Sequence, residues 1–385
     1  MIACAAISAR ALVEAAAADG MATVALDLFG DVDTCRHAEA WWPIGEPAAL
    51  RIERAPLLAA LERLARQDRV QGWIAGSGFD GAPALLAEAA ARLPLLGTPP
   101  AAVQRLRDPR QFFAALDALA VAHPPVRFEA PPCSEADDGW LLKDAGSCGG
   151  WGVSVWRGAP TGFSPGPGHH WQRRVVGLPM SATFIGNGRE AVLLGFNRQL
   201  VQEIGALPFA LPFAFAGIVG PVPVAAAVQH TMKQAVAALT AEFGIVGLAS
   251  LDFLLDGGQV QVLELNARPP ASLVLYPQLH GGGPFRAHLR ACLEGRLPPP
   301  PAATGVRGQA IVYADRGGQL DAAAAARIAA YPGACDLPRA GTRFEPGEPL
   351  CSVAVCGAPG NTDHDVIAEL ARRSATLRTF LETLS

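Results

Sequence analysis

The segment Leu248–Pro269, LASLDFLLDGGQVQVLELNARP, decides how the chain is interpreted. Two apolar runs flank the pair Gly257-Gly258, which favours the tight turn of a β-hairpin. Because side chains alternate across a strand, a turn at these glycines places Asp252 roughly opposite Glu264 and puts Asn266 on the same face as Glu264. Two carboxylates and a carboxamide oxygen then converge on one face of the hairpin.

This convergence of oxygen ligands predicts a metal site. Mg²⁺ prefers carboxylate and amide oxygens and usually shares its coordination sphere with nucleotide phosphates. Without a cation, acids in these otherwise apolar strands would be costly to bury. The alternative is a solvated edge hairpin whose acids occur by chance, and the apolar residues around Glu264 disfavour it. The predicted metal ligands are Asp252, Glu264 and Asn266.

A second motif lies earlier in the chain, in Trp140–Val153, WLLKDAGSCGGWGV. Lys143 ends a predicted strand, and four glycines follow within the segment 146–152. Such a segment suits a flap whose backbone N–H groups close over phosphates, with the lysine pairing with phosphate oxygens. It is not a Walker A loop, because the lysine precedes the glycines. Taken alone the segment fits a surface hairpin equally well, but the acidic hairpin favours a nucleotide site.

Together the two motifs resemble the ATP-grasp ligases. That family combines a lysine on a strand, a Gly-rich flap, a hinge strand for adenine and a late metal hairpin of the form Asp-Phe…Glu-x-Asn-x-Arg. The resemblance implies a multidomain α/β and α+β chain with the ATP-grasp fold. Residues 1–100 would form a pre-ATP-grasp domain with a doubly wound parallel sheet, residues 101–300 the ATP-grasp domain, and residues 301–385 a small C-terminal β-rich region with a closing helix. The flap would span 143–153 and the metal hairpin 248–268.

The resemblance also implies roles for individual residues. Arg268 and Lys143 would be the catalytic residues, with Arg268 holding the substrate carboxylate or the acyl phosphate. ATP and Mg²⁺, with Mn²⁺ as an alternative, would be the cofactors. The residues implied to bind the nucleotide are Lys143, Gly146, Ser147, Gly149, Gly150, Gly152, Gln172, Arg173 and Val175.

Some positions depart from the family pattern. Arg173 replaces the hinge acid, and Pro179 stands where a ribose-binding glutamate is expected. The family's first phosphate lysine is missing at the start of a predicted helix, and Arg110 or Arg107 is expected to substitute for it. These departures leave the contacts with adenine and ribose open.

The implied function is an ADP-forming ligase that joins a small-molecule carboxylate to an amine through an acyl phosphate. Residues 76–79 and 97–113 are similar to a subgroup related to biotin carboxylase and to ligases of methanofuran and tetrahydromethanopterin biosynthesis. The narrower expectation is therefore the addition of an amino acid such as glutamate to a C1-carrier precursor. Two alternatives are a biotin-carboxylase-like carboxylase and a non-catalytic ATP-binding regulatory protein.

The beginning of the chain alternates strand and helix patterns, which predicts a parallel sheet with ligands at the carboxyl ends of its strands. The turn Gly76–Gly81 contains the spacing GxGxxG. It follows a third strand, and no acidic residue comes on a strand about 20 residues later, so it indicates a dinucleotide site only weakly. A simple tight turn is as good an interpretation of these glycines as a ligand site in general, and a better one than a dinucleotide site.

Composition excludes several classes of function. The 385 residues are half hydrophobic with a formal charge of −4, which argues against nucleic-acid binding. No secretory signal or long apolar segment is evident, and the eight cysteines lack metal-ligand spacing. We therefore expect a cytoplasmic protein with reduced thiols and no membrane partner, and a homodimer is left open. The pair His169-His170, in a Gly/Pro-rich stretch, is expected to be solvated rather than metal-binding.

Overall fold

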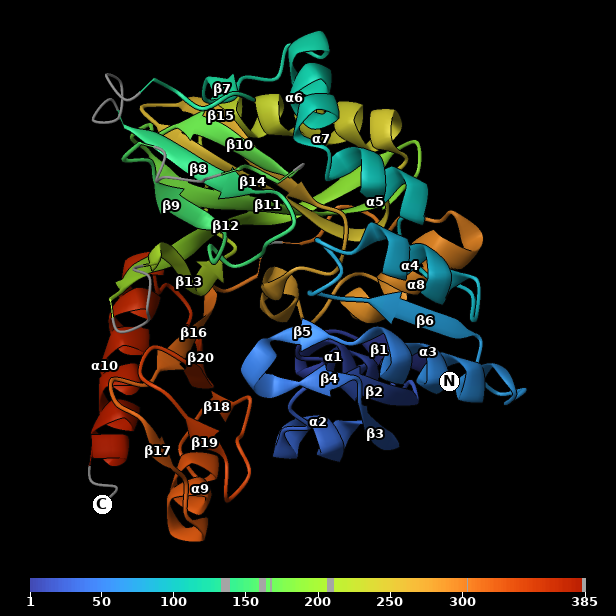
Figure 1. Ribbon diagram of the computed structural model, residues 1–385, viewed down its shortest axis with the longest axis vertical. Coiled ribbons are helices and arrows are strands. Elements are labelled where there is room, and N and C mark those ends of the chain that lie inside the picture. Colours follow the sequence, from blue (N-terminus) through green and yellow to red (C-terminus); the bar gives the residue numbers. More distant parts are fainter. Residues whose placement is uncertain (133–138, 159–163, 167, 206–210, 303, 383–385) are drawn as a thin grey trace.

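The protein is described here by a computed structural model, which covers residues 1–132, 139–158, 164–166, 168–205, 211–302 and 304–382. Figure 1 shows the N-terminal sheet in blue, a large antiparallel sheet in green and yellow, and the last strands beside helix α10 in red. Among the described residues, no helix is long and apolar enough to cross a membrane. The seven described cysteines are free thiols, and Cys133 lies outside the described residues.

The N-terminal sheet is parallel, as predicted, with strand order β3-β2-β1-β6. Its strands are β1 (Ile2–Ala5), β2 (Thr23–Asp27), β3 (Ala40–Pro43) and β6 (Gly72–Ala75). Alternate residues of β1 enter different cores, because helices cover both faces of the sheet. The helices are α1 (Arg10–Ala18) and α8 (Pro284–Glu294) on one face, and α3 (Arg54–Ala65) and α4 (Pro83–Ala90) on the other. Beyond β6, a single parallel bridge joins Trp73 to Leu95.

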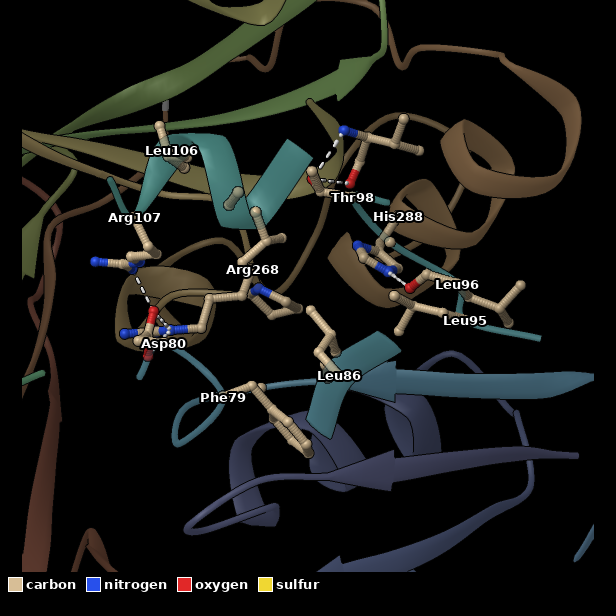
Figure 2. Close-up of a pocket in the computed structure, with 17 residues that line it drawn as sticks. Phe79, Asp80, Leu86, Leu95, Leu96, Thr98, Leu106, Arg107, Arg268 and His288 are labelled. Carbon is tan, nitrogen blue, oxygen red and sulfur yellow. Dashed lines mark hydrogen bonds and ion pairs between the residues drawn. The ribbon is translucent and has the colours of Figure 1, made fainter. Parts of the chain in front are cut away.

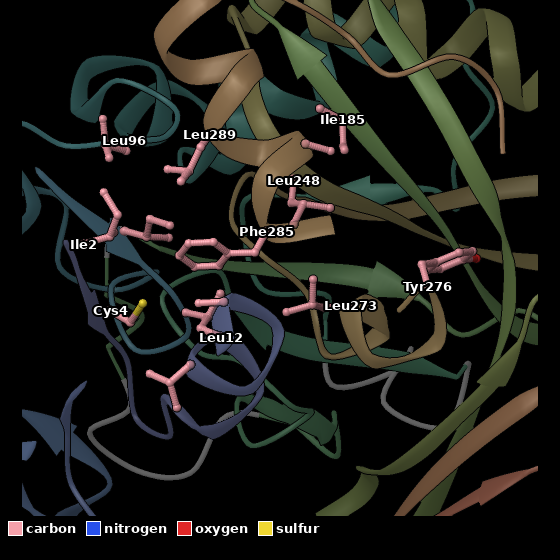
Figure 3. Close-up of a cluster of buried hydrophobic side chains, with 14 of the residues drawn as sticks. Ile2, Cys4, Leu12, Leu96, Ile185, Leu248, Leu273, Tyr276, Phe285 and Leu289 are labelled. Atoms are coloured by element: carbon pink, nitrogen blue, oxygen red, sulfur yellow. The ribbon is translucent and has the colours of Figure 1, made fainter. Parts of the chain in front are cut away.

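One apolar core joins the N-terminal sheet to the large antiparallel sheet. Ile2 and Cys4 of β1 lie in the same cluster as Leu248 of the metal hairpin and Phe285 of α8 (Figure 3). All four side chains are at most 1% exposed. This shared core fixes the loops after the parallel strands relative to the acidic hairpin.

The large sheet has the order β15-β14-β11-β12-β13-β16-β20-β18, and all its pairings are antiparallel. Its strands are β11 (Leu178–Asn187), β12 (Ala191–Ile204), β13 (Leu211–Gly220), β14 (Val246–Asp256), β15 (Gln259–Asn266), β16 (Arg307–Tyr313), β18 (Ala334–Cys335) and β20 (Pro349–Cys356). The pairing of β13 with β16 makes the C-terminal strands a continuation of this sheet. The sequence did not predict β13, whose glycines and prolines are atypical of strands.

Three helices pack on the back of the large sheet: α5 (Pro100–Leu106), α6 (Pro109–Ala118) and α7 (Ala226–Phe243). Helix α7 buries Val228, Met232, Ala235, Val236, Leu239 and Phe243, a spacing that gives one apolar stripe. It ends at Gly244, whose φ of 66° suits a left-handed cap. This layer leaves the opposite face of the sheet for the acidic residues.

A small antiparallel sheet carries the Gly-rich segment, with order β7-β10-β8-β9. Its strands are β7 (Val126–Arg127), β8 (Trp140–Asp144), β9 (Val153–Val155) and β10 (His169–Arg173). The expectation of a solvated histidine pair was wrong: both residues lie in β10, where His170 pairs with Lys143 and is 6% exposed. Burial, together with the charge of Lys143, lowers the pKa of His170 to about 4. Val175 follows the end of β10 instead of lying within a hinge strand.

The remaining elements are short segments and the C-terminal helices. They are α2 (Val32–His37), β4 (Gly45–Glu46), η1 (Pro47–Ala49), β5 (Arg51–Ile52), η3 (Ala271–Leu275), β17 (Gly318–Gln319), α9 (Ala322–Ala329), β19 (Arg343–Phe344) and α10 (Asp363–Glu382). Helix α10 packs against β16 and β20 through Val366 and Leu370.

Helix α8 is tied to the hairpin by a buried histidine. Nδ1 of His288 accepts a hydrogen bond from the Leu248 N–H at 2.8 Å, and Nε2 donates to the Leu96 carbonyl at 3.0 Å. Burial lowers the pKa of His288 to about 4. Only the neutral ring can accept from Leu248, so protonation breaks this link.

We predict that His288 makes the fold sensitive to acid. An unfolded histidine has a pKa near 6.5 and binds protons more tightly than buried His288, so the free energy of unfolding should fall between about pH 6.5 and pH 4. His288→Asn should reduce that loss by up to about 3 kcal/mol. Urea unfolding at a series of pH values measures it, with exposed His230→Asn as the control. Equal pH slopes for wild type and His288→Asn would contradict this role.

Candidate active site

The two acids of the hairpin face each other because the hairpin contains a β-bulge. Phe253 pairs with Val262, whereas Asp252 pairs with Glu264, so Leu263 is an extra residue in β15. In a regular hairpin with this turn, Asp252 would oppose Leu263, and Glu264 would lie on the other face. The bulge therefore brings Asp252 and Glu264 together.

Asn266 completes the acidic face. Its Nδ2 donates to Glu264 Oε1 at 3.2 Å and to Asp252 Oδ2 at 3.3 Å. Asp252 is 9% exposed, and its Oδ1 is buried without a hydrogen-bond partner among the described residues. Burial first, and then the Glu264 carboxylate, raises the pKa of Asp252 to about 7. An oxygen-only set of this kind fits a hard divalent cation.

Lys143 approaches these acids from the small sheet. It lies in β8, and its Nζ donates to Gln172 Oε1 on β10 at 2.9 Å. Burial lowers the pKa of Lys143, and the charges of Glu264 and Asp252 oppose that shift. The predicted phosphate lysine, the hinge glutamine and the acidic pair are therefore neighbours.

Within the predicted flap, 143–153, the loop between β8 and β9 lies against two other parts of the molecule. The Gly149 carbonyl accepts a hydrogen bond from Phe215 N–H of β13 at 2.9 Å. At Gly81, an added Cβ would lie 2.6 Å from the Gly146 carbonyl oxygen, so the flap also touches the loop after β6. Burial raises the pKa of the Cys148 thiol, and nearby Arg268 opposes the shift. The flap is thus held between β13 and the loop after β6.

Two arginines meet one buried aspartate beside the hairpin (Figure 2). Nη2 of Arg107 donates to Asp80 Oδ1 and, at 2.9 Å, to Asn266 Oδ1. Nε of Arg268 donates to the two carboxylate oxygens of Asp80 at 3.2 and 3.0 Å, and its Nη2 to Asn266 Oδ1 at 3.4 Å. Burial alone would raise the pKa of Asp80, but the two arginines hold it below its ordinary value. We call Asp80, Arg107 and Arg268 the arginine cluster.

Sequence reasoning did not single out Asp80, although the turn that contains it was considered as a dinucleotide site. A carboxylate directly after the carboxyl end of a parallel strand was the available signal. Of the two candidates for the missing phosphate lysine, Arg107 reaches the hairpin. Arg110 instead lies over the Phe128 ring at 4.5 Å.

Two other arginines do not join the acidic face. Arg198 pairs with Asp363 of α10 at 2.8 Å. Arg173 lies 5.6 Å from the centre of the Trp140 ring, on the small sheet. The predicted flap residues Gly146, Ser147, Gly149, Gly150 and Gly152 all lie between β8 and β9.

A mostly apolar pocket adjoins the arginine cluster (Figure 2). The pocket is small, with room for about 30 Å³, and it is partly open to solvent. Its apolar lining includes Phe79, Leu86, Leu96, Val103 and Leu106. Its polar residues Thr98 and His288 already form hydrogen bonds within the protein.

Residues 107–272 match the family model of the ATP-grasp domain. The match confirms the resemblance at the level of the superfamily and includes Lys143, the flap and the acidic hairpin. No curated protein sequence matches the chain significantly.

Several solved structures share the fold over nearly the whole chain. The ATP complex of a carboxyaminoimidazole ribonucleotide synthase from Aspergillus clavatus is 16% identical, with a TM-score of 0.69 and coverage of 98% of both chains. A biotin carboxylase from Campylobacter jejuni, in a β,γ-ATP complex, is 14% identical, with a TM-score of 0.68 and coverage of 96% of this chain and 89% of that one. The N5-carboxyaminoimidazole ribonucleotide synthetase from Thermus thermophilus is 19% identical, with a TM-score of 0.66 and coverage of 98% of both chains. The ATP-grasp fold thus extends beyond the matched domain.

We predict that Gly81→Ala loosens the flap, because the new Cβ would press on the Gly146 carbonyl. Chymotryptic cleavage after Trp151, measured by mass spectrometry, should become roughly severalfold faster. Gly97→Ala is the matched control, since nothing lies within 4 Å of its added Cβ. Equal cleavage rates in both variants would contradict the contact.

Proposed function

We propose that this chain is an ADP-forming ligase that uses ATP and Mg²⁺ to join a carboxylate to a nitrogen nucleophile. The observation that carries the proposal is the buried Asp252 Oδ1, which lacks a partner among the described residues and lies beside a second carboxylate. A buried carboxylate beside a second, half-buried one is stabilised by added positive charge or a shared proton. An ATP-grasp domain with Lys143 above that pair supports a magnesium–nucleotide complex as the source of the charge.

Asp252 and Glu264 would be the principal ligands of Mg²⁺, which when bound supplies charge neutralisation to the phosphates. Asn266 is proposed as the third ligand, and its Nδ2 faces the acids in the described structure. Its Oδ1 accepts from Arg107 and Arg268. In this arrangement Asn266 orients the acids and the arginines, and it would become a third oxygen ligand only if its amide rotated.

The remaining residues would position the substrates. Lys143 and the backbone N–H groups of the flap would hold ATP phosphates, and Arg268 would hold the carboxylate. The γ-phosphoryl group would pass to a carboxylate oxygen, giving ADP and an acyl phosphate. The amine would then attack the carbonyl carbon and lose a proton, and the C–O bond to phosphate would break, releasing inorganic phosphate and leaving an amide. The flap over Arg268 would keep water from hydrolysing the acyl phosphate.

A carboxylase is the second candidate, in which bicarbonate would be the activated acid. The whole-chain likeness to biotin carboxylase and to carboxyaminoimidazole ribonucleotide synthase favours it. The altered positions Arg173 and Pro179 favour a non-catalytic nucleotide-binding protein, whereas the acid pair favours an enzyme. The narrower prediction, glutamate joined to a methanofuran- or methanopterin-type precursor, rests on the sequence resemblance alone and stays a prediction, as do Mn²⁺ use and a homodimer.

We predict that nucleotide and metal bind together. Calorimetry should show ADP binding with Mg²⁺ and a collapse of affinity in EDTA. Glu264→Gln should weaken the MgADP complex by roughly tenfold or more, since one charged ligand is lost. Exposed Glu203→Gln should not change it. Equal affinity with and without Mg²⁺ would refute the metal assignment.

Lys143 gives a separate test of the phosphate site. Lys143→Ala should weaken MgADP by roughly tenfold, because a charge-assisted contact with phosphate is removed. Lys233→Ala, on the exposed side of α7, is the control for loss of a lysine. If the two variants lose affinity equally, the phosphate site has been placed wrongly.

The reaction can be tested before the substrates are known. Carboxylic acids, including glutamate and bicarbonate, are screened with MgATP and hydroxylamine, because acyl phosphates react with hydroxylamine. A hydroxamate of one acid, formed with equivalent ADP, is the expected result. ADP formation with bicarbonate alone would favour the carboxylase. ADP formation with an organic acid, but with neither hydroxamate nor amide detected by mass spectrometry, would defeat the ligase proposal.

A further inference from the structure

Asp80 is the point at which the N-terminal sheet reaches the reaction site. It follows strand β6 in the loop 76–81 and is 5% exposed. Its carboxylate contacts the guanidinium groups of Arg107 and Arg268, which come from distant parts of the chain. Two positive charges meet one negative charge, so the arginine cluster keeps a net charge of about +1 available for an anion.

The contacts of Arg268 leave one edge of its guanidinium group open. Nε donates to Asp80, and Nη2 donates to Asn266. In the described part of the chain Nη1 makes no hydrogen bond, and the side chain is 16% exposed. Asp80 thus holds the group from its side, while the terminal edge formed by Nη1 and Nη2 can still donate to an anion. Two parallel hydrogen bonds from that edge match a carboxylate or a phosphate.

We propose that Asp80 is the positioning residue for the anionic substrate: it fixes Arg268 so that the terminal edge of the guanidinium faces the carboxylate or phosphoryl group to be bound. This inference rests on the proposed function. The loop that carries Asp80 also carries Gly81, which contacts Gly146 of the flap. A single loop of the N-terminal sheet therefore positions the anion-binding arginine and supports the flap above it.

Inorganic phosphate is a suitable probe, because an ADP-forming ligase releases it whatever its acid and amine. Phosphate is titrated by calorimetry into protein saturated with MgADP. Wild type should bind it, and Asp80→Asn should weaken phosphate binding by about tenfold or more while MgADP affinity changes by less than about threefold. Asp336→Asn is the matched control, because Asp336 pairs with Arg10 in a contact outside the arginine cluster.

The outcomes separate this inference from the proposed function. Unchanged phosphate binding by Asp80→Asn would overturn the positioning role. Tighter binding would also overturn it, because Asp80 would then compete with phosphate for Arg268. A wild type that binds MgADP but not phosphate would overturn the inference and leave the nucleotide site standing. A wild type that binds neither would overturn both.

A second variant covers the case in which Asp80→Asn does not fold. Asp80→Glu keeps the charge but lengthens the side chain by one methylene, which displaces the guanidinium group. If Asp80 positions Arg268, this variant should lose phosphate affinity and keep MgADP affinity. If Asp80 served folding alone, its charge would suffice and phosphate affinity would be kept. Phosphate affinity equal to that of wild type would overturn the inference.

Discussion

Asp252 and Glu264 lie directly opposite each other on neighbouring strands, where two like charges repel and both are partly removed from water. The surrounding residues are arranged around this repulsion. Asn266 donates to both acids, and Lys143 comes from the small sheet. Even so, Asp252 Oδ1 stays unpaired in the described structure, which is the arrangement expected of residues that bind a cation.

The side-chain amide of Asn266 lies between groups of opposite charge. Asn266 turns its NH₂ group to the acids and its oxygen to Arg107 and Arg268, so it separates a negative face from a positive one. Asp80 offsets part of the positive charge and comes from the N-terminal sheet. That sheet shares one apolar core with β14, which fixes the distance between the two faces (Figure 3). Packing far from the polar groups thus determines their geometry.

Much of the fold could be predicted from local sequence patterns. Apolar β1 and β6 alternate with helices, and Gly257-Gly258 has φ values of 52° and 88°, as a tight hairpin turn requires. The bulge at Leu263 could not be predicted, because nothing in an apolar strand marks which residue is extra. Without it, the expected convergence of Asp252 and Glu264 would have failed.

The arginine cluster could not be predicted for a different reason. Asp80, Arg107 and Arg268 are far apart in sequence, and only the packing of the parallel sheet against the hairpin brings them together. The strand β13 was missed because its pairing with β12 and β16 overrides its unfavourable glycines and prolines. Likewise, His170 is buried by its position in β10, in a stretch whose composition indicates a loop.

We propose that the acid pair of the hairpin binds the metal of a metal–nucleotide complex. Anomalous diffraction at the manganese edge, from crystals grown with MnADP, tests this metal site, with Mn²⁺ in place of Mg²⁺. We expect an anomalous peak within coordinating distance of Asp252 and Glu264, with Asp252 Oδ1 as a ligand. Nucleotide bound with no peak at these carboxylates, or a peak held by other residues, would contradict it.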